Sequence, residues 1–359
     1  MRPPPRWIRR LVLAPLVFAL AIGLIALSPI WLIATALYSP FAAGRLRLLR
    51  VLWLITAYLV VEVVAMSSMV ALWFASGCGW KVHAPAFQRA HYRLAGAMLE
   101  ILFRQARWVL RLRVEINGAT PDKLPVGRPL LVMSRHAGPG DSFLLIHALI
   151  NWYGREPRIV LKNALLWDPT IDILLNRLPN RFIVPGSDRA EDEIADLASG
   201  LDSDDALVIF PEGGNFTPER WIRGIERLRK LGFTAMARRA ERMRNVLPPR
   251  PGGVRAAMAA SPEANVVLVG HTGVDHLQTV GDVWRELPMD KILTMQWWLE
   301  PPENVPAGGE EKVEWLYGWW SRIDAWISEN RPVPLPPPTL LDTPVPGPPV
   351  PPVPGPPAV

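Results

Sequence analysis

The sequence contains one cysteine, Cys78, among 359 residues. A disulfide framework is therefore excluded, and so is a metal site built from several cysteines. The sequence also lacks the signature of any nucleic-acid recognition module, although its net charge of +6 favours an anionic partner. Anionic phospholipid is the partner that also accounts for the long apolar segments near the N-terminus.

Two long apolar stretches, residues 11–38 and 51–76, dominate the first eighty residues. Each is long enough to cross about 30 Å of hydrocarbon. The first follows a cluster of arginines, as in a signal peptide, but it is too long for the apolar part of one, and no convincing cleavage site follows it. We therefore predict two membrane helices joined by a short loop, residues 39–50.

The orientation of this predicted hairpin stays open. Three arginines lie in its loop: Arg45, Arg47 and Arg50. A spanning hairpin with its N-terminus inside would translocate all three, contrary to the positive-inside tendency, whereas a hairpin that dips into one leaflet would not. Glu62 lies within the second stretch, where it indicates incomplete immersion or a polar partner, unless it is simply neutral and hydrogen-bonded.

The rest of the chain alternates apolar runs with helical or loop segments, which favours an α/β fold. We predict a mixed sheet flanked by helices, preceded by the membrane hairpin. Residues 86–110 carry apolar residues at helical spacing and form an amphipathic helix that lies on the membrane or covers the sheet. Asn117-Gly118 marks a turn. The predicted strands are residues 129–134, 158–161, 181–185, 206–210, 265–270 and 291–298.

Three segments near the C-terminus have biased compositions. Residues 219–250 hold ten arginines and lysines against three glutamates, so they form either a solvated helical face or a contact for anionic lipid headgroups. Residues 313–327 form a tryptophan-rich helix that packs in the core or lies at a membrane interface. From residue 332 onward half of the residues are proline, and we expect an extended, disordered tail.

A histidine and an aspartate stand five positions apart after one predicted strand, in His136-Ala-Gly-Pro-Gly-Asp141. The glycines and proline force a turn, which can bring the Asp141 carboxylate onto one nitrogen of His136. The other nitrogen would then be free to act as a general base, an effect worth about 10²–10⁴-fold in rate. In the simpler interpretation, Asp141 caps the next helix and His136 is a packed ring.

A carboxylate beside two glycines follows another predicted strand, in Phe210-Pro-Glu-Gly-Gly-Asn-Phe-Thr217. A ligand can approach the backbone N–H groups of Gly213 and Gly214. Glu212 emerges from a buried strand, so it needs a partner, which in a purely structural role would be backbone N–H groups. A base, an orienting acid and a polar cradle are the parts needed to move an acyl group onto a hydroxyl.

Together the two segments resemble the glycerophospholipid acyltransferase family, in particular the lysophosphatidic acid acyltransferases. That family carries His-x-x-x-x-Asp and then Phe-Pro-Glu-Gly at about this separation. The resemblance covers roughly residues 110–300 and extends to Thr217-Pro-Glu-Arg220 and Leu247-Pro-Pro-Arg-Pro-Gly-Gly253. A subgroup of the family has similar segments at both places.

The resemblance implies roles for several residues. In the family the histidine deprotonates the acceptor hydroxyl, which attacks an acyl thioester, and the aspartate orients the histidine. His136 and Asp141 would be this pair, and Glu212, Gly213 and Gly214 would help bind the acceptor. The resemblance implies no acyl-enzyme, no metal and no cofactor beyond the thioester co-substrate, which is coenzyme A or acyl carrier protein carrying the acyl group.

The sequence departs from the family pattern at the acceptor phosphate. Asn215 stands where the family often has an arginine that is associated with this phosphate. Arg189, near the family's middle motif, is therefore the expected substitute, ahead of Lys162 and Arg181.

Two further departures flank the motifs. Arg135 precedes the histidine where the family often has asparagine, and Val266-Val-Leu-Val-Gly-His271 replaces a segment that usually contains a Val-Pro pair. These changes keep the reaction type that the resemblance implies.

Three other functions remain open. Gly140-Asp141-Ser142-Phe143 resembles the Gly-Asp-Ser-Leu block of a lipase and esterase family, with Ser142 as nucleophile, but such enzymes need a late Asp-x-x-His that this chain lacks. A phospholipid transacylase, or an acyltransferase for another lysolipid headgroup, would use the same histidine and aspartate. A non-catalytic scaffold that presents the proline-rich tail would have no use for both motifs.

The expected protein is a membrane-bound 1-acylglycerol-3-phosphate O-acyltransferase-like enzyme. We divide it into a membrane-anchoring hairpin (1–80), an acyltransferase domain (81–330) and a disordered proline-rich tail (331–359). Its expected partners are membrane phospholipids, the lysophospholipid acceptor and the acyl thioester donor, but no nucleic acid, and the tail could recruit a further partner. In a bacterium it would lie on the cytoplasmic membrane with the catalytic domain in the cytoplasm.

Overall fold

The computed structural model describes residues 3–41, 44, 46–121, 127–138, 140–183, 189–275, 277 and 280–332. The predicted proline-rich tail therefore lies outside the described residues, apart from residues 331 and 332. Arg45 of the predicted hairpin loop also lies outside them. The predicted division into three parts stays a prediction.

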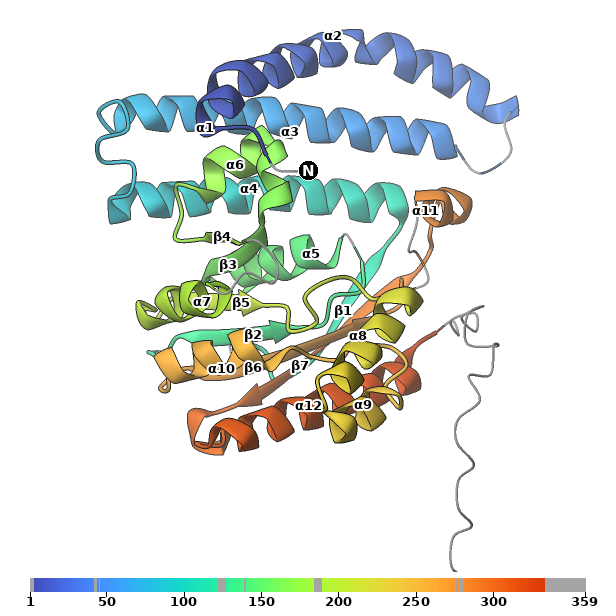
Figure 1. Ribbon diagram of the computed structural model, residues 1–359. Coiled ribbons are helices and arrows are strands. Elements are labelled where there is room, and N and C mark those ends of the chain that lie inside the picture. Colours follow the sequence, from blue (N-terminus) through green and yellow to red (C-terminus); the bar gives the residue numbers. More distant parts are fainter. Residues whose placement is uncertain are drawn as a thin grey trace, which may run out of the picture.

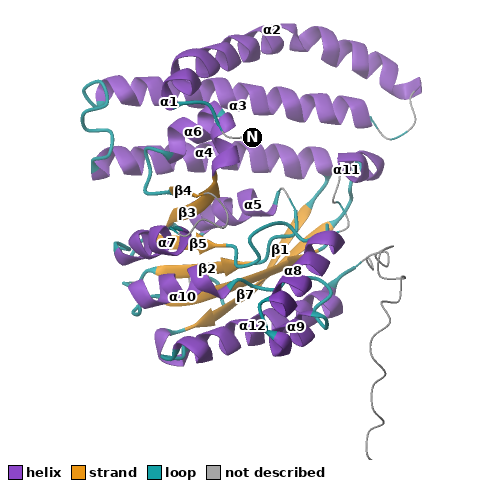
Figure 2. Ribbon diagram, viewed as in Figure 1, coloured by secondary structure: helices purple, strands orange, loops and turns teal. Residues whose placement is uncertain are grey.

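A seven-stranded mixed sheet forms the centre of the molecule (Figures 1 and 2). Its strand order is β1-β7-β6-β2-β5-β3-β4, and every neighbouring pair is parallel except β6 and β7. The predicted fold class, a mixed α/β sheet flanked by helices, is confirmed. The strands are β1 (Arg113–Gly118), β2 (Leu130–Ser134), β3 (Glu156–Lys162), β4 (Arg181–Ile183), β5 (Asp205–Ile209), β6 (Asn265–Thr272) and β7 (Ile292–Glu300).

The sequence did not predict β1, which lies at one edge of the sheet. Its residues are exposed or half-buried, so the strand lacks the apolar run by which the central strands were recognised. It pairs with β7 alone, in parallel, with Arg113 opposite Ile292. The predicted turn at Asn117-Gly118 falls at its end, where Gly118 has a φ of +90°.

Alternate residues of the central strands enter two cores on opposite faces of the sheet. In β2, Leu131 and Met133 join one core, whereas Leu130 and Val132 join the other. The first core is covered by α7 (Ala190–Ser199), α8 (Pro218–Lys230), α9 (Thr234–Ala240), α10 (Pro251–Ala260) and α12 (Gly309–Asn330). The second is covered by α5 (Asp141–His147), the π-helical turn η4 (Ala148–Trp152) and α4 (Pro85–Leu110).

The positions of α12 and α4 on the two faces of the sheet decide between the alternatives that the sequence left open for these helices. Trp320, Ile323 and Ile327 of α12 are fully buried, so the tryptophan-rich helix packs in the core. Helix α4 covers the sheet, and on its other side it packs against α3 (Arg47–Ala75) of the hairpin (Figure 1). The basic segment forms α8 and α9, on the face of the sheet opposite α4 and the hairpin.

Two apolar helical stretches, Arg6–Phe41 and Arg47–Ala75, form the N-terminal hairpin. They are 36 and 29 residues long, and both are long and apolar enough to cross a membrane. The first comprises α1 (Arg6–Ile8), η1 (Arg9–Leu13), α2 (Ala14–Tyr38) and η2 (Ser39–Phe41), and the second is α3. The hairpin lies along the outer side of α4 and of α6 (Pro169–Leu175), as Figure 1 shows.

Both ends of the hairpin contact the rest of the protein. At one end, Arg9 donates two hydrogen bonds to the buried carboxylate of Asp172 in α6, at 3.0 and 3.1 Å. At the other end, Arg47 at the start of α3 donates from Nε to the carbonyl of Leu287 at 2.9 Å. The hairpin therefore lies flat against the domain instead of projecting from it.

Glu62 supplies a further polar contact in the middle of the hairpin. Its side chain is buried, and its Oε1 accepts a hydrogen bond of 2.6 Å from the hydroxyl of Thr170 in α6. The structure thus shows Glu62 hydrogen-bonded to a polar partner.

We expect Asp172→Ala to detach the hairpin, because it leaves the half-buried charge of Arg9 without its partner. Breaking a buried ion pair from one side costs about 3–5 kcal/mol. The measurement is the thermal midpoint in detergent, combined with limited proteolysis of the connection between α3 and α4. The matched control is Glu303→Ala, which breaks the exposed Arg128–Glu303 pair and should cost at most about 1 kcal/mol. Equal effects of the two variants would contradict the docking role of Asp172.

Candidate active site

The two motifs lie at the carboxyl ends of two inner strands of the sheet. Strands β2 and β5 are parallel neighbours, with Val132 opposite Val208, so their carboxyl ends meet. His136 follows β2 and Glu212 follows β5. In open α/β sheets, ligands bind outside the carboxyl ends of the strands, so this edge is the candidate active site.

His136 and Asp141 are hydrogen-bonded, as the turn between them predicts. The Nδ1 atom of His136 lies 3.0 Å from Oδ1 and 3.2 Å from Oδ2 of Asp141. A carboxylate accepts hydrogen bonds, so Nδ1 carries the proton and Nε2 is left as the basic nitrogen. The ring of His136 packs against Phe210, with ring centroids 4.7 Å apart, and 17% of the side chain is exposed.

The backbone also fixes the Asp141 carboxylate. The N–H groups of Ala137, Gly138 and Ser142 donate to it at 2.6, 3.0 and 2.6 Å. Burial would raise the pKa of Asp141, but hydrogen bonds and charge interactions with His136 and His271 outweigh it and hold this pKa well below its ordinary range. Asp141 is therefore a fixed anion beside the imidazole.

A second histidine, His271, lies on the far side of this carboxylate. Its Nε2 is 3.4 Å from Asp141 Oδ2 and 3.3 Å from the carbonyl oxygen of Arg135. The buried guanidinium of Arg135 forms an ion pair with Asp275 and donates to the carbonyl of His271. The motif spacing gave no signal for His271 or Asp275, because both enter from the end of β6, more than a hundred residues further along the chain.

Glu212 joins the two motif loops through backbone hydrogen bonds. Its two carboxylate oxygens accept from the N–H groups of His136, at 3.1 Å, and Leu247, at 2.8 Å. The N–H of Phe216 donates in turn to the carbonyl of His136 at 2.9 Å. These contacts give Glu212 the structural role that the sequence left open, and its part in acceptor binding stays a prediction.

Burial raises the pKa of Glu212 to about 8, although two backbone hydrogen bonds and the charge of Arg135 act against the shift. Glu212 and Asp141 are thus buried carboxyl groups with opposite pKa shifts. The difference follows from their donors, because Asp141 faces two imidazoles and three N–H groups whereas Glu212 faces two N–H groups.

Three cations surround the two glycines of the second motif. A Cβ atom built on Gly213 would lie 3.2 Å from the guanidinium of Arg250, and one on Gly214 would lie 3.2 Å from Arg220 Nη1 and 3.6 Å from Lys162 Nζ. Burial, Arg220 and Arg250 lower the pKa of Lys162, in that order of importance. A cluster of this kind favours an anion beside the glycines.

The structure places the predicted cations differently from one another. Lys162, at the end of β3, belongs to this cluster, whereas Arg189 is exposed at the start of α7 and Arg181 is exposed in β4. Arg220 and Arg250 were not among the cations predicted to bind the acceptor phosphate. Both stand in segments that resemble the subgroup, Thr-Pro-Glu-Arg and Leu-Pro-Pro-Arg, and this was the available signal.

Ser142 lies beside Asp141 and makes a contact that bears on the esterase alternative. Its hydroxyl donates to Asp141 Oδ1 at 3.3 Å. A serine nucleophile instead needs its hydroxyl on a histidine that accepts the proton. As for metals, the described residues contain no group of three or more histidine, cysteine, aspartate or glutamate side chains that could hold an ion.

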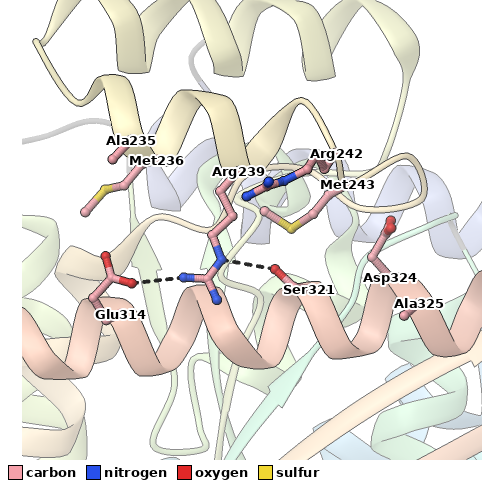
Figure 3. Close-up of a pocket in the computed structure, with 9 residues that line it drawn as sticks. All are labelled: Ala235, Met236, Arg239, Arg242, Met243, Glu314, Ser321, Asp324 and Ala325. Atoms are coloured by element: carbon pink, nitrogen blue, oxygen red, sulfur yellow. Dashed lines mark hydrogen bonds and ion pairs between the residues drawn. The ribbon is translucent and has the colours of Figure 1, made fainter. Parts of the chain in front are cut away.

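A cavity of about 650 Å³ opens elsewhere, between α9 and α12 (Figure 3). Arg239 crosses it and contacts Glu314 and Ser321. None of the predicted site residues lines this cavity. Its lining residues are Ala235, Met236, Arg239, Arg242, Met243, Glu314, Ser321, Asp324 and Ala325.

The raised pKa of Glu212 predicts a pH dependence of stability. Between about pH 5 and pH 8 the folded protein keeps a proton that the unfolded chain loses, so this group lowers the stability progressively as the pH rises. Glu212→Gln removes the titration. We therefore expect the difference in Tm, wild type minus Glu212→Gln, to fall as the pH is raised across this window. The exposed control Glu303→Gln should show no such trend, and a constant difference for Glu212→Gln would contradict the prediction.

Comparison with known proteins finds one family model and one solved structure that are similar to this chain. A family model described as Acyltransferase matches residues 114–271, a range that contains both motifs. A search of curated proteins finds no match. Among solved structures, the chain is similar to the crystal structure of PlsC, the 1-acyl-sn-glycerophosphate (LPA) acyltransferase from Thermotoga maritima, with 13% identity and a TM-score of 0.46 over 77% of this chain and 98% of that one. Residues 114–271 are thus similar to the acyltransferase family.

Proposed function

We propose that this protein transfers a fatty acyl group from an acyl thioester to the free hydroxyl of a lysophospholipid. The observation that carries the proposal is the His136–Asp141 pair at the edge of an acyltransferase domain. Because Nδ1 is engaged by Asp141, Nε2 is the nitrogen left for the acceptor. A partly exposed side chain allows a substrate hydroxyl to reach it.

The proposed reaction needs one base and no covalent enzyme intermediate. His136 Nε2 takes the proton of the acceptor hydroxyl while the hydroxyl oxygen attacks the thioester carbonyl. The resulting tetrahedral intermediate expels the thiolate, which recovers the proton from the imidazolium. Asp141 stays ionised throughout and stabilises the imidazolium that forms. The low pKa of Asp141 supports this role.

The cations beside the second motif suggest the headgroup of the acceptor. Lys162, Arg220 and Arg250 surround Gly213 and Gly214, where the family's usual arginine is replaced by Asn215. A phosphate monoester carries up to two negative charges and several acceptor oxygens, which suit such a cluster. We therefore propose 1-acylglycerol 3-phosphate as the acceptor.

We further propose that the hairpin anchors the enzyme in one leaflet of the membrane. Arg9 and Arg47, at opposite ends of the hairpin, both contact the domain. A helix pair that crossed the bilayer would carry one of these ends to the far side, away from its contact. Anchorage in one leaflet also keeps the loop arginines untranslocated, which satisfies the positive-inside tendency. In a bacterium this would be the inner leaflet of the cytoplasmic membrane, with the catalytic domain in the cytoplasm.

A phospholipid transacylase would use the same histidine and aspartate. It differs in the donor, because the acyl group would come from an ester of another phospholipid and no thiol would be released. Assays with an acyl thioester alone and with phospholipid alone separate the two reactions.

The test of the general base is His136→Ala, which should abolish thioester-dependent acyl transfer while the protein still folds and partitions to membranes. Asp141→Asn should lose nearly as much, because an amide can hold the wrong tautomer. The readout is free thiol released with purified protein in lipid vesicles. Ser142→Ala is the matched control and should keep substantial activity without labelling by fluorophosphonates. Activity of His136→Ala within a few-fold of the wild type would end the assignment, and stoichiometric labelling of Ser142 would favour the esterase.

The acceptor site is tested by separate alanine variants of Arg220 and Arg250. A charge-assisted contact to phosphate contributes about 1.5–3 kcal/mol, so each loss should raise the KM for lysophosphatidic acid by roughly 10- to 150-fold. The KM for the acyl donor should change far less. Arg189→Ala in the same assay tests the expectation drawn from the sequence, and an unchanged KM would make Arg189 a surface residue. A wild type that prefers an acceptor without a phosphate monoester would refute this headgroup and leave the acyl transfer reaction in place.

A further inference from the structure

Two departures from the family pattern, Arg135 and His271, meet beneath the candidate catalytic pair. Their contacts are reciprocal. Arg135 Nη1 donates to the carbonyl of His271, and His271 Nε2 lies 3.3 Å from the carbonyl of Arg135. Both side chains are buried, with relative exposures of 1% for Arg135 and 5% for His271. The end of β6 is thereby joined to the residue directly before His136.

The surroundings of His271 determine its tautomer. Its Nε2 faces two acceptors, the Arg135 carbonyl at 3.3 Å and the Asp141 Oδ2 atom at 3.4 Å. An unprotonated nitrogen there would put lone pairs against both oxygens, so Nε2 carries a hydrogen and shares it between them. His271 is therefore a donor to the carboxylate that orients His136.

The Asp141 carboxylate is thus held between two imidazoles. Its Oδ1 lies 3.0 Å from His136 Nδ1, and its Oδ2 lies 3.4 Å from His271 Nε2. On this geometry we propose that His271 is a positioning residue for acyl transfer, which holds Asp141 in the orientation that keeps the proton of His136 on Nδ1. The proposal rests on the proposed function, in which His136 is the base.

A buried ion pair keeps His271 in place. Arg135, which binds the carbonyl of His271, is paired with Asp275, and the carboxylate of Asp275 also accepts from the hydroxyl of Thr272 and from the N–H of Gly273 at 3.1 Å. Arg331, at the end of α12, adds a second cation 3.7 Å from Asp275. The backbone from His271 to Asp275, at the end of β6, is therefore fixed to Arg135.

The role predicts a particular kinetic signature. His271 is buried and contacts Asp141, so we expect its loss to leave substrate binding unchanged. Asp141 would lose one donor, and the imidazolium of His136 would be less well stabilised in the transition state. A change of this kind lowers kcat without raising KM. Partners that orient a functional histidine are typically worth about 10- to 100-fold.

The experiment compares His271→Gln with His271→Leu in the full-length protein in lipid vesicles. Glutamine can place an amide N–H near the position of Nε2, whereas leucine fills a similar volume without a donor. We expect His271→Leu to lower kcat by about 10- to 100-fold with both KM values within about threefold, and His271→Gln to recover most of the rate. Equal losses in the two variants would overturn the proposal.

A double-mutant cycle separates positioning from general destabilisation. The cycle uses the residual kcat that Asp141→Asn retains, measured at high enzyme concentration. If His271 acts through Asp141, then His271→Leu should have little further effect on this residual kcat. The matched control is His91→Leu. His91 is also buried, but it bonds the carbonyl of Phe87 and contacts Arg177, near the hairpin and away from Asp141. Its effect on kcat should be small and should combine additively with Asp141→Asn. Additivity for His271→Leu would overturn the proposal.

A spectroscopic measurement keeps the proposal testable even if thioester-dependent transfer fails. In protein with ¹⁵N-labelled histidine rings, the signal of the His136 Nδ1 proton identifies its hydrogen bond to Asp141. We expect this signal to persist in His271→Gln and to shift or broaden in His271→Leu, while His91→Leu leaves it unchanged. An unchanged signal in His271→Leu would refute the positioning role independently of activity, whereas an inactive wild type that shows the expected signals would refute only the proposed function.

Discussion

The buried carboxylate of Asp141 is the interaction on which the site depends. An isolated anion in this position would be too costly to keep, so the surrounding chain supplies donors from several elements. Three are N–H groups of its own loop, one is the imidazole of His136, and one is the imidazole of His271 from β6. Satisfying this single charge therefore determines the shape of the turn, the tautomer of the histidine and the packing of β2 against the end of β6.

Glu212 is also a buried carboxyl group, but its role is to link two segments of backbone. The loop after β2 and the segment between α9 and α10 both offer a backbone N–H, and a carboxyl group with two oxygens can accept from both. It bonds the N–H of His136 and that of Leu247, and burial raises its pKa to about 8. A group that readily becomes neutral at this place adds little negative charge beside Asp141. The two carboxyl groups can therefore lie close together in a buried site while only one of them stays firmly ionised.

The sequence predicted contacts between residues that are close along the chain and missed contacts between residues that are far apart in it. The His136–Asp141 hydrogen bond follows from the glycine and proline turn between them, and six strands follow from apolar runs with alternating connections. Strand β1 was missed because it is largely polar and pairs only at the edge of the sheet with β7, some 180 positions further along. The ion pair of Arg135 with Asp275 and the approach of His271 to Asp141 were not predicted either, because the residues in each pair are far apart along the chain. Only the pairing of β2 with β6 brings those residues together, and no spacing rule encodes it.

Polar contacts also determine how the N-terminal hairpin lies against the rest of the protein. An apolar helix pair has no intrinsic reason to lie flat, since its length would suit a bilayer crossing. What holds it flat is polar: Arg9 on Asp172 at one end, Arg47 on the Leu287 carbonyl at the other, and Glu62 on Thr170 between them. A polar contact gains strength where water is scarce, so these three bonds should be stronger beneath a leaflet than in solution. If the hairpin lies in a leaflet as proposed, the surrounding lipid would help to keep it docked on the domain that contains the His136–Asp141 pair.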